Sequence, residues 1–367
     1  MHLGFGLYSH QLDETHFAFA RQCGATHLVV HLVDYFAGRD AQQRRDQPVG
    51  DLDGWGRASG RETLWTAAQL KALQQRVKDA GLTLFALENL NPGHWYDILL
   101  DGPQRDRQVA DVQRMLEAMG EAGIAALGYY FSLAGVAGRT TGPFARGGAQ
   151  SVGMDGPFDT PLPRRMVWNM VVDEAAGDQP HAPVTRPQLW DRLRRFLEAV
   201  VPVAERAGVK LAAHPDDPPL PEIRGTPRLI YQPRLYQELI DLCDSPHNGL
   251  ELCVGTLAEM TEPDLYAWID RYAQQDRIVY VHLRNVRDKV PYYRETFIDE
   301  GDVDVPRVLR ILHERGFEGV VIPDHAPRMS CDAPWHAGMA FAMGYLCATM
   351  QDLARTEAQA VAKEPQP

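Results

Sequence analysis

Residues 186–214, RPQLWDRLRRFLEAVVPVAERAGVKLAAH, contain the pattern that decides the fold. Apolar residues recur every three or four positions over 186–208, which predicts an amphipathic helix. The run that follows, 209–214, is short and apolar, as a buried strand is. A helix followed at once by a buried strand is the repeating unit of a parallel sheet with crossover helices.

The same unit recurs along nearly the whole chain. Eight such repeats favour an α/β fold of the closed (β/α)8 TIM-barrel type over an open doubly wound sheet, and G-x-G-x-x-G does not follow the first strand. We expect one barrel domain over 1–354, a long insertion after the fourth strand at 132–185 that forms a lid or an oligomer contact, and a flexible tail at 355–367. The expected strands are 3–8, 26–32, 82–88, 124–131, 209–214, 248–253, 278–283 and 319–324.

Composition and charge restrict the partners. The chain has 367 residues, of which 45% are hydrophobic and 23% charged, and its formal net charge is −12. A negative charge opposes binding to nucleic acid or to an anionic membrane. With no apolar run of membrane-spanning length and no signal-peptide pattern, we expect a cytoplasmic protein. The five cysteines are scattered, which argues against a disulfide framework or a zinc ribbon.

Polar or titratable side chains end all of the predicted strands. In barrels of this type the active site gathers at the C-terminal ends of the strands, where the connecting loops converge. A single histidine or cysteine at a strand end is more often structural. Polar or titratable residues at the ends of all eight strands, gathered on one rim of the barrel, indicate a binding site. The residues are Tyr8 with His10, His31, Glu88, Tyr130, His214, Cys253, His282, and Asp324 with His325.

The last four predicted strands end in His214, Cys253, His282 and Asp324. Two imidazoles, a thiolate and a carboxylate together neutralise a divalent cation and leave coordination positions for substrate and water. Mixed nitrogen, sulfur and oxygen ligands suit Mn²⁺, Fe²⁺, Co²⁺ or Zn²⁺ and disfavour Ca²⁺ and Mg²⁺. We therefore predict a site for one divalent metal ion.

Ordered segments in the second half of the chain carry a family resemblance. They are HPDDPP (214–219), GTPRL (225–229), NGLELCVGT (248–256), VHLRNV (281–286), ETFIDEGDVDV (295–305) and PDHAPRM (323–329). This series resembles the motifs of the mannonate dehydratases, metal-dependent carbon–oxygen lyases (hydro-lyases) on a xylose-isomerase-like TIM barrel. The resemblance implies dehydration of D-mannonate, or of a related aldonate, to a 2-keto-3-deoxy acid such as 2-keto-3-deoxy-D-gluconate. It also implies Mn²⁺ or Fe²⁺ as the metal and the same four ligands.

The dehydration that the resemblance implies needs acid–base groups that transfer protons and groups that bind the substrate carboxylate. His325, which directly follows Asp324, is our first candidate for acid–base work, and Tyr8 is a second. Candidates to hold the substrate carboxylate are the three arginines Arg139, Arg146 and Arg284. Further candidate substrate contacts are His31, Glu88 and Asp216; Asp216 would bind a hydroxyl or orient an imidazole.

One segment departs from the family pattern. Where the family carries PGY before a small-residue helix, this chain has PWHAG, which puts Trp335 in place of the glycine and His336 in place of a tyrosine that acts in catalysis. A histidine also moves protons near neutral pH, so His336 is a candidate catalytic residue. The bulk of Trp335 predicts a different pocket.

Two alternatives remain open from the sequence. The same barrel and metal could serve an isomerase or epimerase of a keto sugar, or an eliminase of a glycoside. The chain could also be a catalytically idle sugar-binding relative. In each case the partner is a small sugar acid or related sugar, and we expect a homo-oligomer, a dimer or larger.

Overall fold

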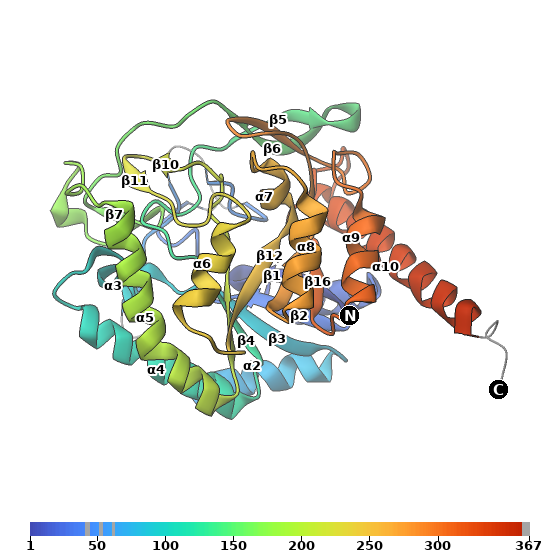
Figure 1. Ribbon diagram of the computed structural model, residues 1–367, viewed down its shortest axis with the longest axis horizontal. Coiled ribbons are helices and arrows are strands. Elements are labelled where there is room, and N and C mark those ends of the chain that lie inside the picture. Colours follow the sequence, from blue (N-terminus) through green and yellow to red (C-terminus); the bar gives the residue numbers. More distant parts are fainter. Residues whose placement is uncertain (41–44, 51–53, 61–62, 362–367) are drawn as a thin grey trace.

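The computed structural model describes residues 1–40, 45–50, 54–60 and 63–361. At its centre is a closed barrel of parallel strands in the order β1-β16-β13-β12-β9-β4-β3-β2 (Figure 1). This confirms the predicted (β/α)8 barrel, with a strand at each expected position. The barrel strands are β1 (His2–Tyr8), β2 (His27–His31), β3 (Thr83–Glu88), β4 (Ala126–Tyr129), β9 (Lys210–Ala213), β12 (Asn248–Cys253), β13 (Ile278–His282) and β16 (Val320–Ile322).

Helices surround the barrel and connect its strands (Figure 1). In α5 the Thr185 side chain accepts a hydrogen bond from the backbone N–H of Gln188, and Gly208 has φ 70° just past the last turn, so capping defines both ends. The helices are α1 (Glu14–Gln22), α2 (Ala67–Asp79), α3 (Tyr96–Leu100), α4 (Arg105–Ala122), α5 (Arg186–Ala207), α6 (Leu235–Leu242), α7 (Val254–Glu259), α8 (Leu265–Gln274), α9 (Val305–Glu314) and α10 (Pro334–Val361).

The last helix differs from the sequence expectation. The sequence predicts a flexible tail from residue 355, whereas α10 continues to Val361. Good helix formers such as alanine, glutamate and glutamine fill this stretch, which explains the continuation. Residues 362–367 of the expected tail lie outside the described residues.

Small side chains in the barrel interior leave room for polar groups beneath the strand ends. Ala86, Ala126 and Ala212 belong to the buried interior cluster. On β4, a Cβ added to Gly128 would lie 2.7 Å from Glu251 Oε2. A glycine at this position therefore lets the Glu251 side chain cross the barrel interior.

A second sheet joins the insertion to a hairpin that follows β13. Its order is β14-β15-β6-β5, and it lies toward the top of Figure 1. We did not predict the hairpin, because the polar residues of NVRDK hide its alternation. The strands are β5 (Thr140–Ala145), β6 (Ala149–Asp155), β14 (Asn285–Lys289) and β15 (Tyr292–Thr296); the shorter pairs are β7 (Met166–Val167) with β8 (Met170–Val171) and β10 (Glu222–Ile223) with β11 (Thr226–Pro227).

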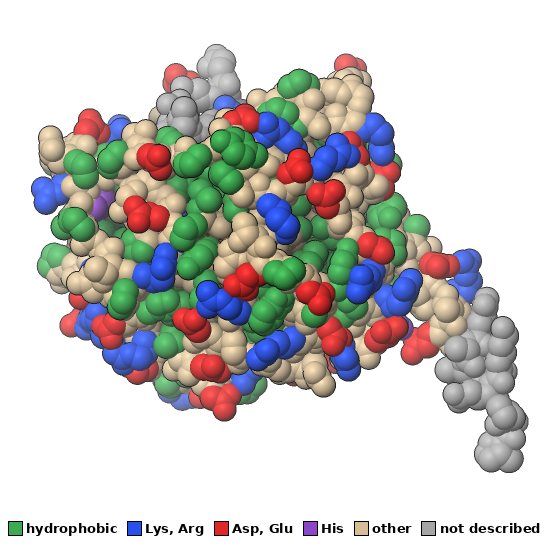
Figure 2. Space-filling view, turned by 45° about the horizontal axis from the view of Figure 1, so that its top comes forward, with side chains coloured by type: hydrophobic (Ala, Val, Ile, Leu, Met, Phe, Trp, Pro, Cys, Tyr) green, Lys and Arg blue, Asp and Glu red, His purple; other side chains and the backbone are tan. Residues whose placement is uncertain are grey.

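The surface mixes both signs of charge. Figure 2 shows acidic and basic side chains interspersed over the visible face, with hydrophobic side chains between them. This distribution differs from the basic stripe typical of nucleic-acid-binding surfaces. Among the helices of the described ranges, none combines the length and the apolar character that crossing a membrane requires.

Candidate active site and metal centre

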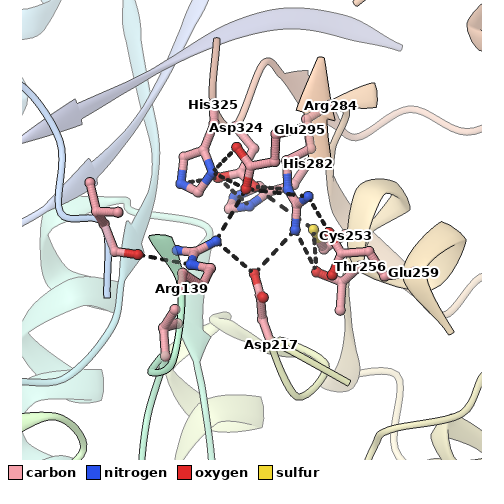
Figure 3. A network of polar contacts seen from close by, with 12 residues as sticks. Arg139, Asp217, Cys253, Thr256, Glu259, His282, Arg284, Glu295, Asp324 and His325 are labelled. Atoms are coloured by element: carbon pink, nitrogen blue, oxygen red, sulfur yellow. Dashed lines mark hydrogen bonds and ion pairs between the residues drawn. The ribbon is translucent and has the colours of Figure 1, made fainter. Parts of the chain in front are cut away.

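The structure brings the four predicted metal ligands together at the C-terminal ends of β9, β12, β13 and β16. Ligand atoms of His214, Cys253 and His282 all lie within 4.8 Å of one another. Asp324 joins them: its Oδ2 is 3.9 Å from Cys253 Sγ and its Oδ1 is 3.5 Å from His282 Nδ1 (Figure 3). Parallel register explains this proximity, because Cys253 and His282 are paired neighbours on β12 and β13.

The chemistry of this donor set fits a divalent cation. Burial alone would raise the pKa of the Cys253 thiol, but the charge of Arg284 and the nearby His214 and His282 side chains lower it to about 6. Thr256 Oγ1 also donates to Cys253 Sγ at 3.0 Å, so the sulfur is prepared as a thiolate. His282 Nδ1 is buried and has no hydrogen-bond partner in the described part of the chain, as expected for an atom that would bind a metal.

Two carboxylates orient the histidine ligand of β13. His282 Nε2 lies 3.0 Å from Glu88 Oε2 and 3.2 Å from Glu251 Oε1, which leaves Nδ1 as its ligating atom. Although burial opposes ionisation, the charges of His31 and His282 lower the pKa of Glu88 to about 2. Burial and the negative charge of Glu88 raise the pKa of Glu251. Sequence reasoning missed Glu251, although its position two residues before Cys253 was a usable signal.

His214 is oriented by the backbone. Its Nδ1 lies 2.7 Å from the carbonyl oxygen of Pro215. An Nδ1–H donated to that carbonyl leaves Nε2 to face the other ligands.

The candidate acid–base residue His325 forms a pair with Glu295 of β15. Its Nδ1 is 3.0 Å from Glu295 Oε2; Glu295 is buried, and 9% of the His325 side chain is exposed. Burial opposes protonation of the imidazole, but Asp324 and Glu295 together raise the pKa of His325. Tyr8 and His31 line the same cavity and stack with ring centroids 4.6 Å apart. Sequence reasoning missed Glu295 because it lies on the unpredicted hairpin.

The arginines Arg139 and Arg284 are buried and held by carboxylates (Figure 3). Arg284 contacts Asp217 Oδ2 and Asp324 Oδ2 at 3.1 and 2.9 Å. Arg139 reaches Asp217 Oδ2 and Glu295 Oε1 at 3.3 and 3.2 Å. Both guanidinium groups therefore fix the positions of carboxylates in the site. Arg139 in addition lines the cavity.

Three candidate residues lie away from this cavity. Arg146 pairs with Asp299 at 3.1 Å and is half exposed. Buried Asp216 pairs with Arg228 at 3.0 Å and accepts from the backbone N–H of Leu229 and Ile230.

The remaining one, His336, begins α10 beside α1, where its ring lies 4.8 Å from that of Phe19. Neighbouring Trp335 is buried among core residues and donates to Gln47 Oε1 at 3.2 Å. The structure thus does not bring His336 to the metal ligands, because the start of α10 packs against α1.

Together the fold and the site define a class. A closed (β/α)8 barrel with a metal-ligand cluster and a histidine–glutamate pair at its strand ends is a barrel enzyme of the xylose-isomerase-like type. The xylose isomerase domain protein from Planctomyces limnophilus shares this fold, with a TM-score of 0.56 and 13% identity over 96% of this chain and 98% of that one.

Sequence comparison then gives the family. The D-mannonate dehydratase (UxuA) family model matches residues 1–149 and 179–354, and the chain belongs to this hydro-lyase family. Mannonate dehydratase 2 of Halalkalibacterium halodurans is 30% identical over 280 residues, which cover 71% of this chain and 79% of that protein. Mannonate dehydratase 1 of Bacillus licheniformis is 30% identical over 293 residues, covering 71% and 76%.

A solved structure agrees at the level of the fold. The mannonate dehydratase from Streptococcus suis serotype 2 aligns with a TM-score of 0.75 and 24% identity, over 100% of this chain and 96% of that one.

Proposed function

We propose that this protein is a metal-dependent dehydratase that converts D-mannonate, or a closely related aldonate, to the 2-keto-3-deoxy acid. Family membership supports the reaction class. The observation that carries the proposal is the cluster of His214, Cys253 and His282, with ligand atoms within 4.8 Å of one another, beside Asp324 and His325.

His214, Cys253, His282 and Asp324 would hold the metal, for which Mn²⁺ or Fe²⁺ is our proposal, with Co²⁺ or Zn²⁺ as substitutes. A bound divalent cation supplies positive charge that stabilises the anion formed on proton loss, or the departing hydroxide. Glu88 supports the site by holding the His282 ring, so that Nδ1 faces inward.

The remaining steps fall to the residues of the cavity. Dehydration removes the proton from C2, breaks the C3–O bond and releases the hydroxyl as water after it gains a proton. The enol then takes a proton at C3 and becomes the 2-keto acid, so the net change is loss of one water. With Nδ1 held by Glu295, His325 exchanges protons through Nε2. Burial, with the charges of Asp324 and Glu88, raises the pKa of Tyr8, which therefore acts as a hydrogen-bond donor.

Incubation of the Mn²⁺-loaded protein with a panel of aldonates in D₂O tests the proposal. We expect NMR to detect a 2-keto-3-deoxy acid from D-mannonate or from an aldonate that differs from it at one carbon. Deuterium entering a substrate without loss of water would instead indicate an isomerase or epimerase. No product from any aldonate at full metal occupancy would overturn the proposal.

A further inference from the structure

Part of the cavity wall is aromatic. The Tyr35 ring lies 4.9 Å from the Trp55 ring and 6.0 Å from the Trp168 ring, measured between centroids, and Trp55 and Trp168 are 5.2 Å apart. All three residues line the cavity and are buried. The wall therefore presents ring faces and few mobile groups to a ligand.

Two polar atoms of residues lining this cavity have no hydrogen-bond partner among the residues that the structure describes. The indole Nε1 of Trp55 is a donor, the Oδ1 of Asn89 is an acceptor, and both atoms are buried. Both residues line the cavity. Tyr35 contacts both residues: its ring packs on Trp55, and its hydroxyl lies 3.0 Å from Asn89 Nδ2. Buried polar groups are nearly always paired, so an unpaired donor and an unpaired acceptor on two residues that line one cavity and both contact Tyr35 call for a ligand.

This position is set apart from the metal ligands by a chain of contacts. His282 Nε2 contacts Glu88 at 3.0 Å, Glu88 contacts His31 Nε2 at 3.5 Å, and His31 Nδ1 contacts the Tyr35 hydroxyl at 2.9 Å. Asn89 and Trp55 follow beyond Tyr35. When the carboxylate, C2 and C3 of an aldonate occupy the metal side, its polyol tail is the part that extends to this wall.

The hairpin that carries Trp168 holds it in an unfavourable backbone conformation. Trp168 and Asn169 connect β7 and β8 with φ of 56° and 57°, in a region that bulky residues rarely adopt. Contacts on both sides maintain it: Trp168 Nε1 donates to the Tyr130 carbonyl at 3.0 Å, and the Trp55 backbone N–H donates to the Asn169 carbonyl at 2.7 Å. Strain of this kind is typical of sites where a side chain must be presented in one position.

The same hairpin lies outside the family match, which leaves residues 150–178 unmatched. The wall thus combines Trp55 and Asn89 from the part of the chain that the family model matches with Trp168 from a segment that it leaves unmatched.

We propose that Trp55 and Asn89 form a hydroxyl-binding subsite that recognises the terminal hydroxyl of the aldonate chain, with Tyr35 and Trp168 as its walls. A hydroxyl donates one hydrogen bond and accepts another, so a single hydroxyl satisfies both Asn89 Oδ1 and Trp55 Nε1. This inference rests on the proposed function and adds the group by which the enzyme selects its substrate.

The test compares D-mannonate with 6-deoxy-D-mannonate, which lacks only the terminal hydroxyl. For the Mn²⁺-loaded enzyme we expect kcat/KM to favour D-mannonate by about 100-fold, because the deoxy compound leaves a buried donor and a buried acceptor unpaired. In Trp55→Phe, which keeps an aromatic ring but has no donor, this preference should fall to about 10-fold or less, mainly through a higher KM for D-mannonate.

Trp268→Phe on α8 is the matched control, because Trp268 stacks on Tyr272 away from the cavity; it should keep the full preference. Equal kcat/KM for both compounds in the unmodified enzyme, or an undiminished preference in Trp55→Phe, would overturn the subsite while leaving the dehydratase intact. Conversion of no aldonate in the panel would contradict the proposed function, and the subsite with it; if another aldonate is converted instead of D-mannonate, the same comparison is made with that aldonate and its form lacking the terminal hydroxyl.

Discussion

Cys253 shows how a single residue is prepared for its role. It ends β12 in full burial, yet Thr256 donates to its sulfur at 3.0 Å and Arg284 helps to lower its pKa to about 6. Such surroundings favour a thiolate, which a buried structural cysteine has no need to become.

Replacement of this thiolate tests the ligand set. Cys253→Ser should lose most of the bound metal, because an alcohol at neutral pH supplies neither the charge nor the soft donor. Elemental analysis of the purified protein measures the loss. Exposed Cys331 offers a matched control, and Cys331→Ser should retain a full equivalent. Full occupancy in Cys253→Ser would exclude the sulfur as a ligand.

His325 should separate metal binding from turnover. In His325→Asn we expect unchanged metal content and a kcat lower by about 100-fold or more, since the asparagine cannot exchange protons. The control is His313→Asn, which removes an imidazole from α9 that pairs with Glu357 at 3.1 Å. Turnover at the normal rate in His325→Asn would remove this residue from the mechanism.

Among single residues, the sequence predicted those whose position is set by the repeating strand–helix unit. Each proposed metal ligand ends a strand, so position in the repeat was enough to select it. Glu251 lies inside a strand and Glu295 on a hairpin, and only their contacts with His282 and His325 identify them. His336 was assigned by matching a local motif, which carries no information on how α10 packs.

Among the elements, the loop after β9 is held by buried ion pairs, and the pair Asp216–Arg228 lies within the loop itself. Asp216 contacts Arg228 at 3.0 Å and accepts two backbone hydrogen bonds at 2.7 Å each. These contacts join the HPDDPP segment to residues 228–230, so His214 emerges from a fixed loop. Pro215, Pro218 and Pro219 also restrict the backbone of this segment, so the prolines are only part of the reason for its rigidity.

Asp216→Ala should therefore act on stability. Removing one partner leaves the Arg228 charge buried, and we expect the free energy of unfolding to fall by about 3 to 5 kcal/mol. Urea denaturation followed by circular dichroism measures this change. The exposed pair Lys71–Glu121 at 3.1 Å serves as comparison, and Glu121→Ala should have little effect. A similarly small effect for Asp216→Ala would show that the loop is held in another way.

The hairpins lay beyond sequence reasoning for a physical reason. Strand β15 pairs with β6, more than a hundred residues away in the chain, and such pairing depends on tertiary contacts that no local pattern encodes. The β7–β8 turn uses Trp168 and Asn169 instead of the usual Asn-Gly, so its turn signal was hidden.

For the whole molecule, periodicity alone predicted the architecture. Eight apolar runs alternating with helical segments leave a closed parallel barrel as the natural arrangement, and the observed order of strands follows it.

Metal binding should couple to the stability of this barrel, because the proposed ligands come from four strands around it. A metal that binds only the folded chain stabilises it by mass action, so chelation should lower Tm by about 5 °C. Differential scanning calorimetry with and without Mn²⁺ provides the measurement. In Cys253→Ser the metal-dependent shift should disappear; an equal shift in that variant would place the stabilising metal elsewhere.

The most direct test titrates the metal-free protein with Mn²⁺ and measures, at each step, the bound metal and the rate at which a 2-keto-3-deoxy acid forms from D-mannonate, or from the aldonate that the panel shows to be converted. The proposed site predicts that activity rises in proportion to bound Mn²⁺ and reaches its maximum at one equivalent per chain. Product formation by the metal-free protein, or no product once one equivalent is bound, would contradict a metal-dependent dehydratase.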